Sequence, residues 1–243
     1  MVVNEPDVRR EYHLLSVVVP VFNERNTVAE IIRRMRAVEL PVPVEFVVVD
    51  DGSSDGSDKV LAALADSTVR VIHHPKNRGK GAAVRTGLEA ARGDLVLIQD
   101  ADLEYDPDDW PSLLAPVLKG KARVVYGSRF TGERKNMLPS HWIGNRLLTL
   151  VTNLLYKSTL SDMETCYKLF DRSVLEGVRI ESDRFEFEPE ITAKVLLKGE
   201  RIYEVPISYA GRETAEGKKI TWRDGFGAMR TLVRFRFRRR SRR

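Results

Sequence analysis

The sequence predicts an α/β domain in which a mostly parallel sheet is flanked by helices, followed by a basic amphipathic helix at the C-terminus. Short apolar runs without polar alternation, typical of strands covered on both faces, alternate with helical patterns along the chain. Most of these runs end abruptly in acidic or small polar residues. Charge is concentrated at the end, because residues 218–243 hold eleven Lys and Arg and one acid, a net +10 in a chain whose total is +5.

Composition favours one globular domain with an appendage, since 42% of the 243 residues are hydrophobic and 31% are charged. We expect a lead-in at 1–12, a domain at 13–219 and a basic tail at 220–243. Cys166 is the one cysteine, which excludes a disulfide scaffold and a zinc site built from cysteines. No apolar run reaches the roughly 18 residues of a membrane span and no signal-peptide core is present, so we expect a cytoplasmic location.

The first half alternates strands and helices in a regular order. Thr27 and Glu30 have the spacing of a capping box, which predicts the start of the first helix, and Pro20 is expected to end the strand before it. The expected strands are Leu14–Val19, Val44–Val49, Val69–Ile72, Leu95–Ile98 and Ala122–Tyr126. The helices after the first are expected at Ser57–Ala65, Ala82–Ala91 and Pro107–Leu118.

The fourth strand leads directly into three carboxylates, Asp100, Asp102 and Glu104. Neighbouring carboxylates repel one another, and a hard divalent cation such as Mg²⁺ or Mn²⁺ takes oxygen ligands of this kind. In an open α/β sheet, ligands also bind outside the carboxyl ends of the strands. The turn therefore predicts a metal site, with the alternative that Asp102 or Asp106 merely caps the following helix.

Other strand ends carry further candidates for the same edge. Lys80 lies between Gly79 and Gly81 at the start of a helix, where a phosphate can bind, although Walker A spacing is absent. Arg129 follows the fifth strand. For Lys80 and Arg129 the alternatives are contact with an anionic ligand and an ion pair with nearby acids, whereas Asp50 is expected to support its own loop.

The second half is less regular. It is expected to contain a polar loop at Thr131–Ser140, a helix at Asn145–Tyr156 and a strand-like stretch at Asp162–Phe170. The segment Phe185–Glu190 is expected to lead into a helix that ends at Leu197, followed by a strand at Arg201–Val205. Residues Tyr209–Lys219 form a basic, glycine-containing loop that is expected to close over an anion.

The tail has the pattern of a helix that lies on a membrane surface. One helical stripe is apolar, and Arg223, Arg230, Arg234 and Arg238 flank it. The stripe consists of Trp222, Phe226, Met229, Val233 and Phe237. We expect it to bind an anionic lipid surface; the alternative is that the stripe packs on the domain. Nucleic-acid binding is not expected, because the basic residues are confined to the end and no nucleic-acid motif is present.

Five motifs in this order resemble the inverting glycosyltransferases of family 2, whose fold is the nucleotide-diphosphosugar transferase (GT-A) fold. They are VVVPVFNE (Val17–Glu24), VVVDDGSSDGS (Val47–Ser57), NRGKGAAVRTGLEAARGD (Asn77–Asp94), QDADLEYDP (Gln99–Pro107) and YGSRF (Tyr126–Phe130). Later segments, including DMETCYKLF, resemble the polyprenyl-phosphate mannose and glucose synthases.

The resemblance implies a role for each matching position. Pro20, Phe22 and Glu24, with Val49 and Asp51, would line the nucleotide pocket. Asp100, Ala101 and Asp102 would hold ribose, diphosphate and metal. Glu104 would be a further metal ligand, although close relatives often have Gln or Ser there. Arg129, Arg212 and Lys218 would grip the donor diphosphate and the acceptor phosphate.

The implied reaction transfers a hexose, from GDP-mannose or UDP-glucose, to polyprenyl phosphate at the inner face of the membrane, with the enzyme peripheral to it. A phosphate acceptor is already anionic at neutral pH, because its second pKa is about 6, and needs no base. If the acceptor is instead a hydroxyl on a soluble molecule, Glu188 or Asp162 is the candidate base. Their alternatives are a helix-dipole contact for Glu188 and a turn cap for Asp162.

Overall fold

The computed structural model describes residues 10–212 and 222–238. The strands are β1 Leu15–Val21, β2 Val44–Asp50, β3 Val69–His73, β4 Leu95–Ile98, β5 Val124–Ser128, β6 Arg134–Lys135, β7 Lys168–Asp171, β8 Ile202–Pro206 and β9 Tyr209–Ala210. The helices are α1 Val28–Ala37, α2 Ser57–Leu64, α3 Lys80–Ala90, α4 Trp110–Leu118, α5 Pro139–Tyr156, α6 Arg172–Leu175, α7 Phe187–Leu197 and α8 Trp222–Phe237. A short 3₁₀ turn, Pro107–Asp109, precedes α4.

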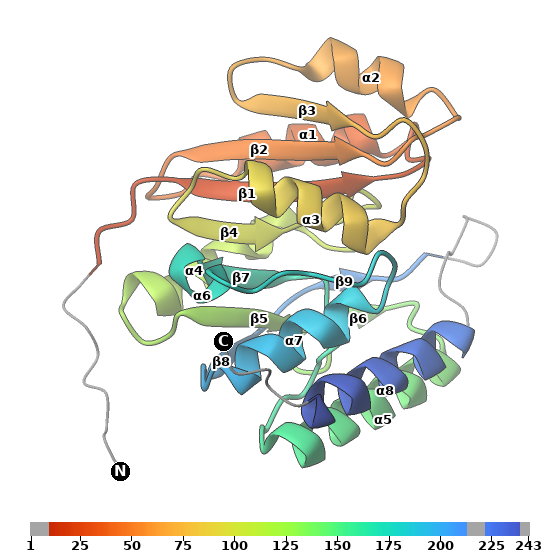
Figure 1. Cartoon of the computed structure of the whole chain (residues 1–243). Coiled ribbons are helices and arrows are strands. Elements are labelled where there is room, and N and C mark those ends of the chain that lie inside the picture. The colour runs from red at the N-terminus through yellow and green to blue at the C-terminus, as the bar shows by residue number, and fades with distance from the viewer. Residues whose placement is uncertain (1–9, 213–221, 239–243) are drawn as a thin grey trace.

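The main sheet has seven strands in the order β3-β2-β1-β4-β7-β5-β8 (Figure 1). Six strands run in one direction, and β7 is antiparallel to both of its neighbours, with Leu97 opposite Leu169 and Tyr126 opposite Lys168. Because β7 runs the other way, it begins at the edge where β4 and β5 end. The segment before Lys168 therefore lies along the same edge as the strand ends that the sequence singles out.

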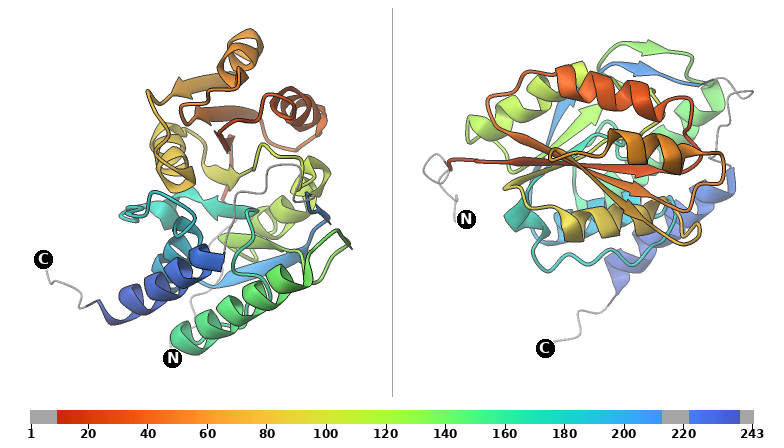
Figure 2. Two further views of the ribbon diagram at one scale, coloured as in Figure 1. Left: turned by 90° about the vertical axis from the view of Figure 1, so that its right-hand side faces the viewer. Right: turned by 90° about the horizontal axis from the view of Figure 1, so that it is seen from above.

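Helices cover both faces of the sheet, as the predicted fold class requires. Figure 2 shows α1 and α4 on one face and α3 and α7 on the other. Helices α5 and α8 lie side by side beyond α7, where Leu148 and Met163 pack with Ala228 and Leu232 in a second small core. Within the described residues, no helix combines the length and apolar character needed to cross a bilayer.

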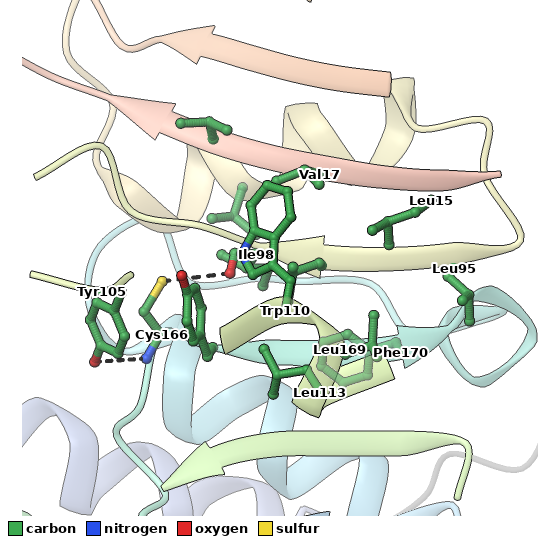
Figure 3. Packing of buried hydrophobic residues seen from close by; sticks show 14 of the residues in the cluster. Leu15, Val17, Leu95, Ile98, Tyr105, Trp110, Leu113, Cys166, Leu169 and Phe170 are labelled. Carbon is green, nitrogen blue, oxygen red and sulfur yellow. Dashed lines mark hydrogen bonds between the residues drawn. The ribbon is translucent and has the colours of Figure 1, made fainter. Parts of the chain in front are cut away.

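The sheet core fixes the start of the acidic turn. Figure 3 shows Leu15, Leu95, Trp110 and Phe170 packed between sheet and helix, and none of the four side chains is exposed to solvent. Gln99, the last residue before that turn, accepts hydrogen bonds from Trp110 Nε1 at 3.0 Å and from the hydroxyl of Tyr167 at 2.7 Å. A buried amide held by two donors keeps the end of β4 in one place.

Two predictions about the first strand–helix unit are wrong in detail. Strand β1 continues through Pro20 to Val21. Its ladder to β4 ends at the Val18–Ile98 pair, so a proline two residues later removes no hydrogen bond from that side. Thr27 precedes α1 but makes no cap, because its hydroxyl donates to Glu24 Oε2 at 2.7 Å, while Glu30 pairs with Arg33 and Arg34.

Three later boundaries also differ from the prediction. In the stretch predicted at Asp162–Phe170, strand β7 begins only at Lys168 and continues to Asp171, and the residues before it are irregular. Helix α5 begins at Pro139, six residues before the predicted start, because Pro suits the first turn of a helix. The loop before it contributes β6, which pairs with β9 in a small parallel sheet.

Candidate active site

The carboxyl ends of β1, β2, β4 and β5 meet at one edge of the sheet, together with the segment that precedes β7. Parallel strands bring residues that are distant in sequence to this edge, as the sequence analysis expects. Of the predicted residues, Val49 and Ala101 are buried there, whereas Pro20 and Phe22 are partly exposed at the end of β1. Lys218 lies outside the described residues.

Asp51, after β2, holds the loop that leads into α3. Its carboxylate accepts hydrogen bonds from Asn77 Nδ2 at 3.0 Å and from the backbone nitrogens of Arg78 and Gly79, and it lies 2.6 Å from His74 Nδ1. Gly79 has φ 100°, and a Cβ there would overlap the carbonyl oxygen of Asp183. The Asp51 carboxylate thus fixes a loop whose conformation at position 79 is accessible only to glycine. Its predicted contact with a nucleotide stays a prediction.

Lys80 and Glu188 belong to a chain of charges that links four elements and is buried at Glu188 and Lys168. Lys80 lies 2.7 Å from Asp100 and 3.6 Å from Glu188, and Glu188 also pairs with Lys168. Burial opposes the charge on Lys80, but Asp100, Cys166 and Glu188 outweigh it and raise the Lys80 pKa. The structure thus gives Lys80 an ion pair at the strand ends, which was one of the two alternatives.

Asp102 lies among like charges. Burial, and then the charges of Asp100 and Glu104, raise the pKa of Asp102 to about 7, against a lowering by Arg212. Between the acids, Leu103 has φ 63°, a left-handed conformation that costs a side chain with a Cβ about 1–2 kcal/mol. The turn is therefore strained both electrostatically and in its backbone, which is typical of a functional site.

The oxygen donors of this turn fit a hard divalent cation. Asp100 and Asp102 offer carboxylate oxygens, and a cation between them would relieve the repulsion that raises the pKa of Asp102. Glu104 is already engaged, since its two oxygens accept from the Tyr209 hydroxyl and the backbone nitrogen of Arg212, both at 2.9 Å. Among the described residues, no three Asp, Glu, His or Cys side chains are already gathered around one point.

Arg212 closes the β9 segment over the acidic turn. Its guanidinium donates to Glu24 Oε2 at 2.7 Å and, through Nε, to the backbone oxygen of Asp102 at 2.8 Å. Glu24 and Arg212 are 188 positions apart in the chain. Glu24, predicted to line the nucleotide pocket, thus pairs directly with Arg212, which was predicted to grip the diphosphate and the acceptor phosphate.

Arg129 and Asp162 form a buried fork-to-fork ion pair. Arg129 Nε and Nη2 donate to the two Asp162 oxygens at 2.7 and 2.8 Å, and the Arg129 backbone nitrogen adds a third bond at 3.0 Å. The structure thus gives Arg129 the ion-pair alternative and Asp162 a positioning role. Both candidate bases, Asp162 and Glu188, are held by cations.

Sequence reasoning missed three residues at this edge. Lys168 is fully buried and pairs with Glu188; a lone cation in the apolar stretch CYKLF was the available signal. Tyr209 binds Glu104, which no local pattern predicts. Glu164 has a buried Oε1 atom without a hydrogen-bond partner among the described residues, and burial, followed by Glu188, raises its pKa to about 7.

Comparison with known proteins gives a family and a fold. Residues 16–179 match the model of the family described as glycosyl transferase family 2. The chain is 33% identical over 224 residues to the low-salt glycan biosynthesis hexosyltransferase Agl6 of Haloferax volcanii, covering 90% of this chain and 53% of the relative. It is 29% identical over 212 residues to the dodecaprenyl-phosphate galacturonate synthase of Rhizobium johnstonii, covering 84% of this chain and 61% of the relative.

A third relative, the undecaprenyl-phosphate 4-deoxy-4-formamido-L-arabinose transferase of Pseudomonas aeruginosa, is 33% identical over 224 residues, covering 90% of this chain and 62% of the relative. The chain therefore spans between half and two thirds of these relatives' length. Among solved structures, mannosyl-3-phosphoglycerate synthase from Rubrobacter xylanophilus aligns with a TM-score of 0.71 at 23% identity, over 92% of this chain and 73% of that one. That likeness confirms that the chain has the GT-A fold.

Proposed function

The chain belongs to glycosyl transferase family 2, and from that premise we propose that it is a metal-dependent inverting hexosyltransferase that uses polyprenyl phosphate as acceptor. The proposal rests on one observation above all, the strained acidic turn of Asp100 and Asp102, which lies between Lys80 and Arg212 at the carboxyl edge of the sheet. Two of the similar relatives are named for transfer to a polyprenyl phosphate. The donors we propose are GDP-mannose and UDP-glucose.

The residues of the turn have separate tasks in this proposal. Asp100 and Asp102 hold the cation, which when bound supplies Lewis-acid neutralisation of the charge that develops on the leaving diphosphate. Lys80 and Arg212 add fixed positive charge on either side of that diphosphate. Arg212 reaches the diphosphate by leaving Glu24, so donor binding is coupled to breaking this ion pair.

The acceptor phosphate attacks the anomeric carbon from the face opposite the diphosphate, which inverts its configuration. A phosphate monoester is mainly dianionic at neutral pH, with a second pKa near about 6, so no residue has to remove a proton. That agrees with a site whose two candidate bases, Glu188 and Asp162, are both committed to ion pairs.

We propose that the paired helices α5 and α8 bring this site to an anionic membrane surface. Helix α8 packs on the domain through Ala228, Leu232 and Phe235. Three members of the predicted stripe, Phe226, Val233 and Phe237, face outward instead, and Phe226 and Phe237 are each 71% exposed. Met229 packs partly against the second core, as the alternative expects.

Helix α5 extends the outward apolar face. Its exposed side chains follow helical spacing, and the helix packs against α8. They are Trp142, Ile143, Leu147, Leu150 and Leu154. Arg230 is exposed on α8, whereas Arg234 and Arg238 pair with Glu181. An apolar face bordered by arginine suits the lipid interface, where each nearby basic residue contributes about 1 kcal/mol on an anionic bilayer.

The test is turnover of labelled nucleotide sugars, including GDP-mannose and UDP-glucose, with Mg²⁺ or Mn²⁺ and with polyprenyl phosphate, a soluble acceptor or neither. We expect label to move into the organic phase only with polyprenyl phosphate, and to be lost in Asp102→Ala. Label found only in a water-soluble product would overturn the lipid acceptor and leave the donor chemistry intact. In that case Glu188 becomes the base to test.

A further inference from the structure

The sheet topology places Glu164 at the carboxyl edge of the sheet, where β4 and β5 end. Strand β7 is antiparallel and begins at Lys168, opposite Tyr126 of β5, and Leu169 lies opposite Leu97 of β4. The residues just before Lys168 therefore cross the ends of β4 and β5. Glu164 lies on this crossing segment, near enough to Arg129, after β5, for that charge to act on it. Two residues later, the backbone nitrogen of Cys166 donates to the hydroxyl of Tyr105, which follows the acidic turn, at 3.1 Å (Figure 3).

The carboxyl group of Glu164 is incompletely bonded. In the described part of the chain, three buried side-chain polar atoms lack a hydrogen-bond partner, and two of them belong to neighbours, Glu164 Oε1 and Thr165 Oγ1. The third, Arg70 Nε, is on β3, at the far edge of the sheet. Buried polar groups are nearly always bonded in native proteins, so adjacent exceptions at a binding edge indicate a partner that arrives with a ligand.

The nearest cations do not serve as that partner. Lys168 has three protons, and it uses them on the carbonyl oxygens of Met163 and Thr165 and on Glu188. Arg129 directs its fork at Asp162. Both cations lie close enough to act on the charge of Glu164, yet neither bonds to it, so an internal ion pair does not account for its position.

The chemistry of the atom selects the kind of ligand group. A carboxyl oxygen accepts hydrogen bonds whether or not the group is ionised, whereas the phosphates of donor and acceptor at neutral pH offer mainly acceptors. The hydroxyl groups of a sugar are donors. We propose that Glu164 is a specificity-determining residue that accepts a hydrogen bond from a hydroxyl of the transferred hexose. This inference rests on the proposed function, because it presumes a nucleotide-sugar donor.

The experiment is a double-mutant cycle in which substitutions of Glu164 are combined with removal of single hydroxyl groups from the sugar. The probes are UDP-glucose and GDP-mannose with their 3-, 4- and 6-deoxy derivatives, assayed by kcat/KM with the wild type, Glu164→Gln and Glu164→Ala. We expect the wild type to discriminate against one deoxy sugar by about 10- to 100-fold, as for a hydrogen bond to a charged group. In Glu164→Ala we expect that ratio to fall to near one while the other ratios stay unchanged.

Glu204→Gln is the matched control. Glu204 is also a glutamate of this edge with a raised pKa, caused first by burial, but its oxygens accept from the backbone nitrogens of Ser161 and Asp162. A carboxylate that only positions a loop should lower kcat/KM by the same factor for every sugar. Thermal melts of all variants identify any that fail to fold, and Glu164→Gln keeps the side-chain shape.

Two outcomes overturn the inference and leave the glycosyltransferase proposal standing. One is a fall in kcat/KM in Glu164→Ala that is equal for all sugars, as in the control. The other is a kcat/KM that is unchanged for every sugar. Failure of the wild type to transfer hexose from any nucleotide sugar overturns the proposed function and this inference together. A rise in KM for the acceptor alone, with unchanged sugar ratios, would instead assign Glu164 to the acceptor site and refute a sugar contact.

Discussion

The loops after β2 and β4 use carboxylates in opposite ways. Asp51 is 2% exposed and its oxygens are filled by Asn77, two backbone N–H groups and the His74 ring, so its charge stabilises the loop. Asp102 instead faces Asp100 and Glu104, which together with burial raise its pKa to about 7. The two are equivalent in sequence, each an acid just beyond a buried strand. Their surroundings make the first a part of the fold, whereas the second keeps the charge repulsion that the proposed cation would relieve.

Substitution of Asp102 should break this comparison most strongly. In Asp102→Asn we expect kcat/KM to fall by roughly 10²–10³-fold, the usual cost of removing one group that stabilises transition-state charge. The melting temperature should stay the same or rise, because repulsion with Asp100 and Glu104 is removed. Steady-state kinetics and a thermal melt measure both. A large loss of stability would show that Asp102 is structural, like Asp51.

The reverse pattern is expected at Asp51. Asp51→Ala leaves Asn77 Nδ2 and the backbone nitrogens of Arg78 and Gly79 without an acceptor, so we expect the free energy of unfolding to fall by roughly 2–4 kcal/mol. Chemical denaturation measures this. Asp51→Asn, which keeps one acceptor oxygen, should lose less. If both variants unfold like the wild type while nucleotide binding is lost, the carboxylate serves the ligand and not the loop.

Glu164 is a further acid whose surroundings raise its pKa, and this should make the free energy of unfolding depend on pH. Burial, and next the charge of Glu188, raise its pKa from the ordinary 4.5 to about 7. Between these values the folded protein keeps a proton that the unfolded chain has released, so stability from this group is full below pH 4.5 and is lost as pH rises towards about 7. Glu164→Gln should therefore gain roughly 1–3 kcal/mol over the wild type at pH 8 and nothing at pH 4.5.

Denaturation of wild type and variant at the two pH values measures that difference. Comparing variant with wild type cancels other groups that titrate in the same range, including Asp102, whose raised pKa acts in the same direction. An equal effect of the substitution at both pH values would mean that Glu164 is ionised throughout.

The smallest effects on stability are expected on the outward face of α8. Phe226→Glu and Phe237→Glu alter side chains that are 71% exposed, so we expect the free energy of unfolding to change by less than about 0.5 kcal/mol. Flotation with anionic vesicles should drop, because apolar area is lost and negative charge is added. Leu232→Ala, in the packed face of the same helix, is the contrasting variant, and it should destabilise the protein by about 2–5 kcal/mol. Unchanged flotation of both Glu variants would refute membrane docking through this face.

Much of the fold was predictable because its signals are local. The valine-rich strands of the first half carry their pattern within five to seven residues, and the mostly parallel order with flanking helices is confirmed. The acidic turn was predictable for the same reason. Contacts such as Arg212 with Glu24 and Tyr209 with Glu104 join positions more than a hundred residues apart, and no local pattern encodes them. The reversal of β7 is a further example, since its residues suit a strand of either direction.

That reversal also bears on how the chain is made. Strands β1 to β4 are complete once residue 98 has been synthesised, but β5 cannot extend this sheet directly, because β7 lies between β4 and β5. Until residues 168–171 leave the ribosome, β4 is an open, apolar edge, the kind of surface that pairs wrongly with other chains. Joining the two halves requires loop closure over about 70 residues, a slow, non-local step. The strand that starts at the carboxyl edge of the sheet is thus also the one whose late insertion joins β4 to β5.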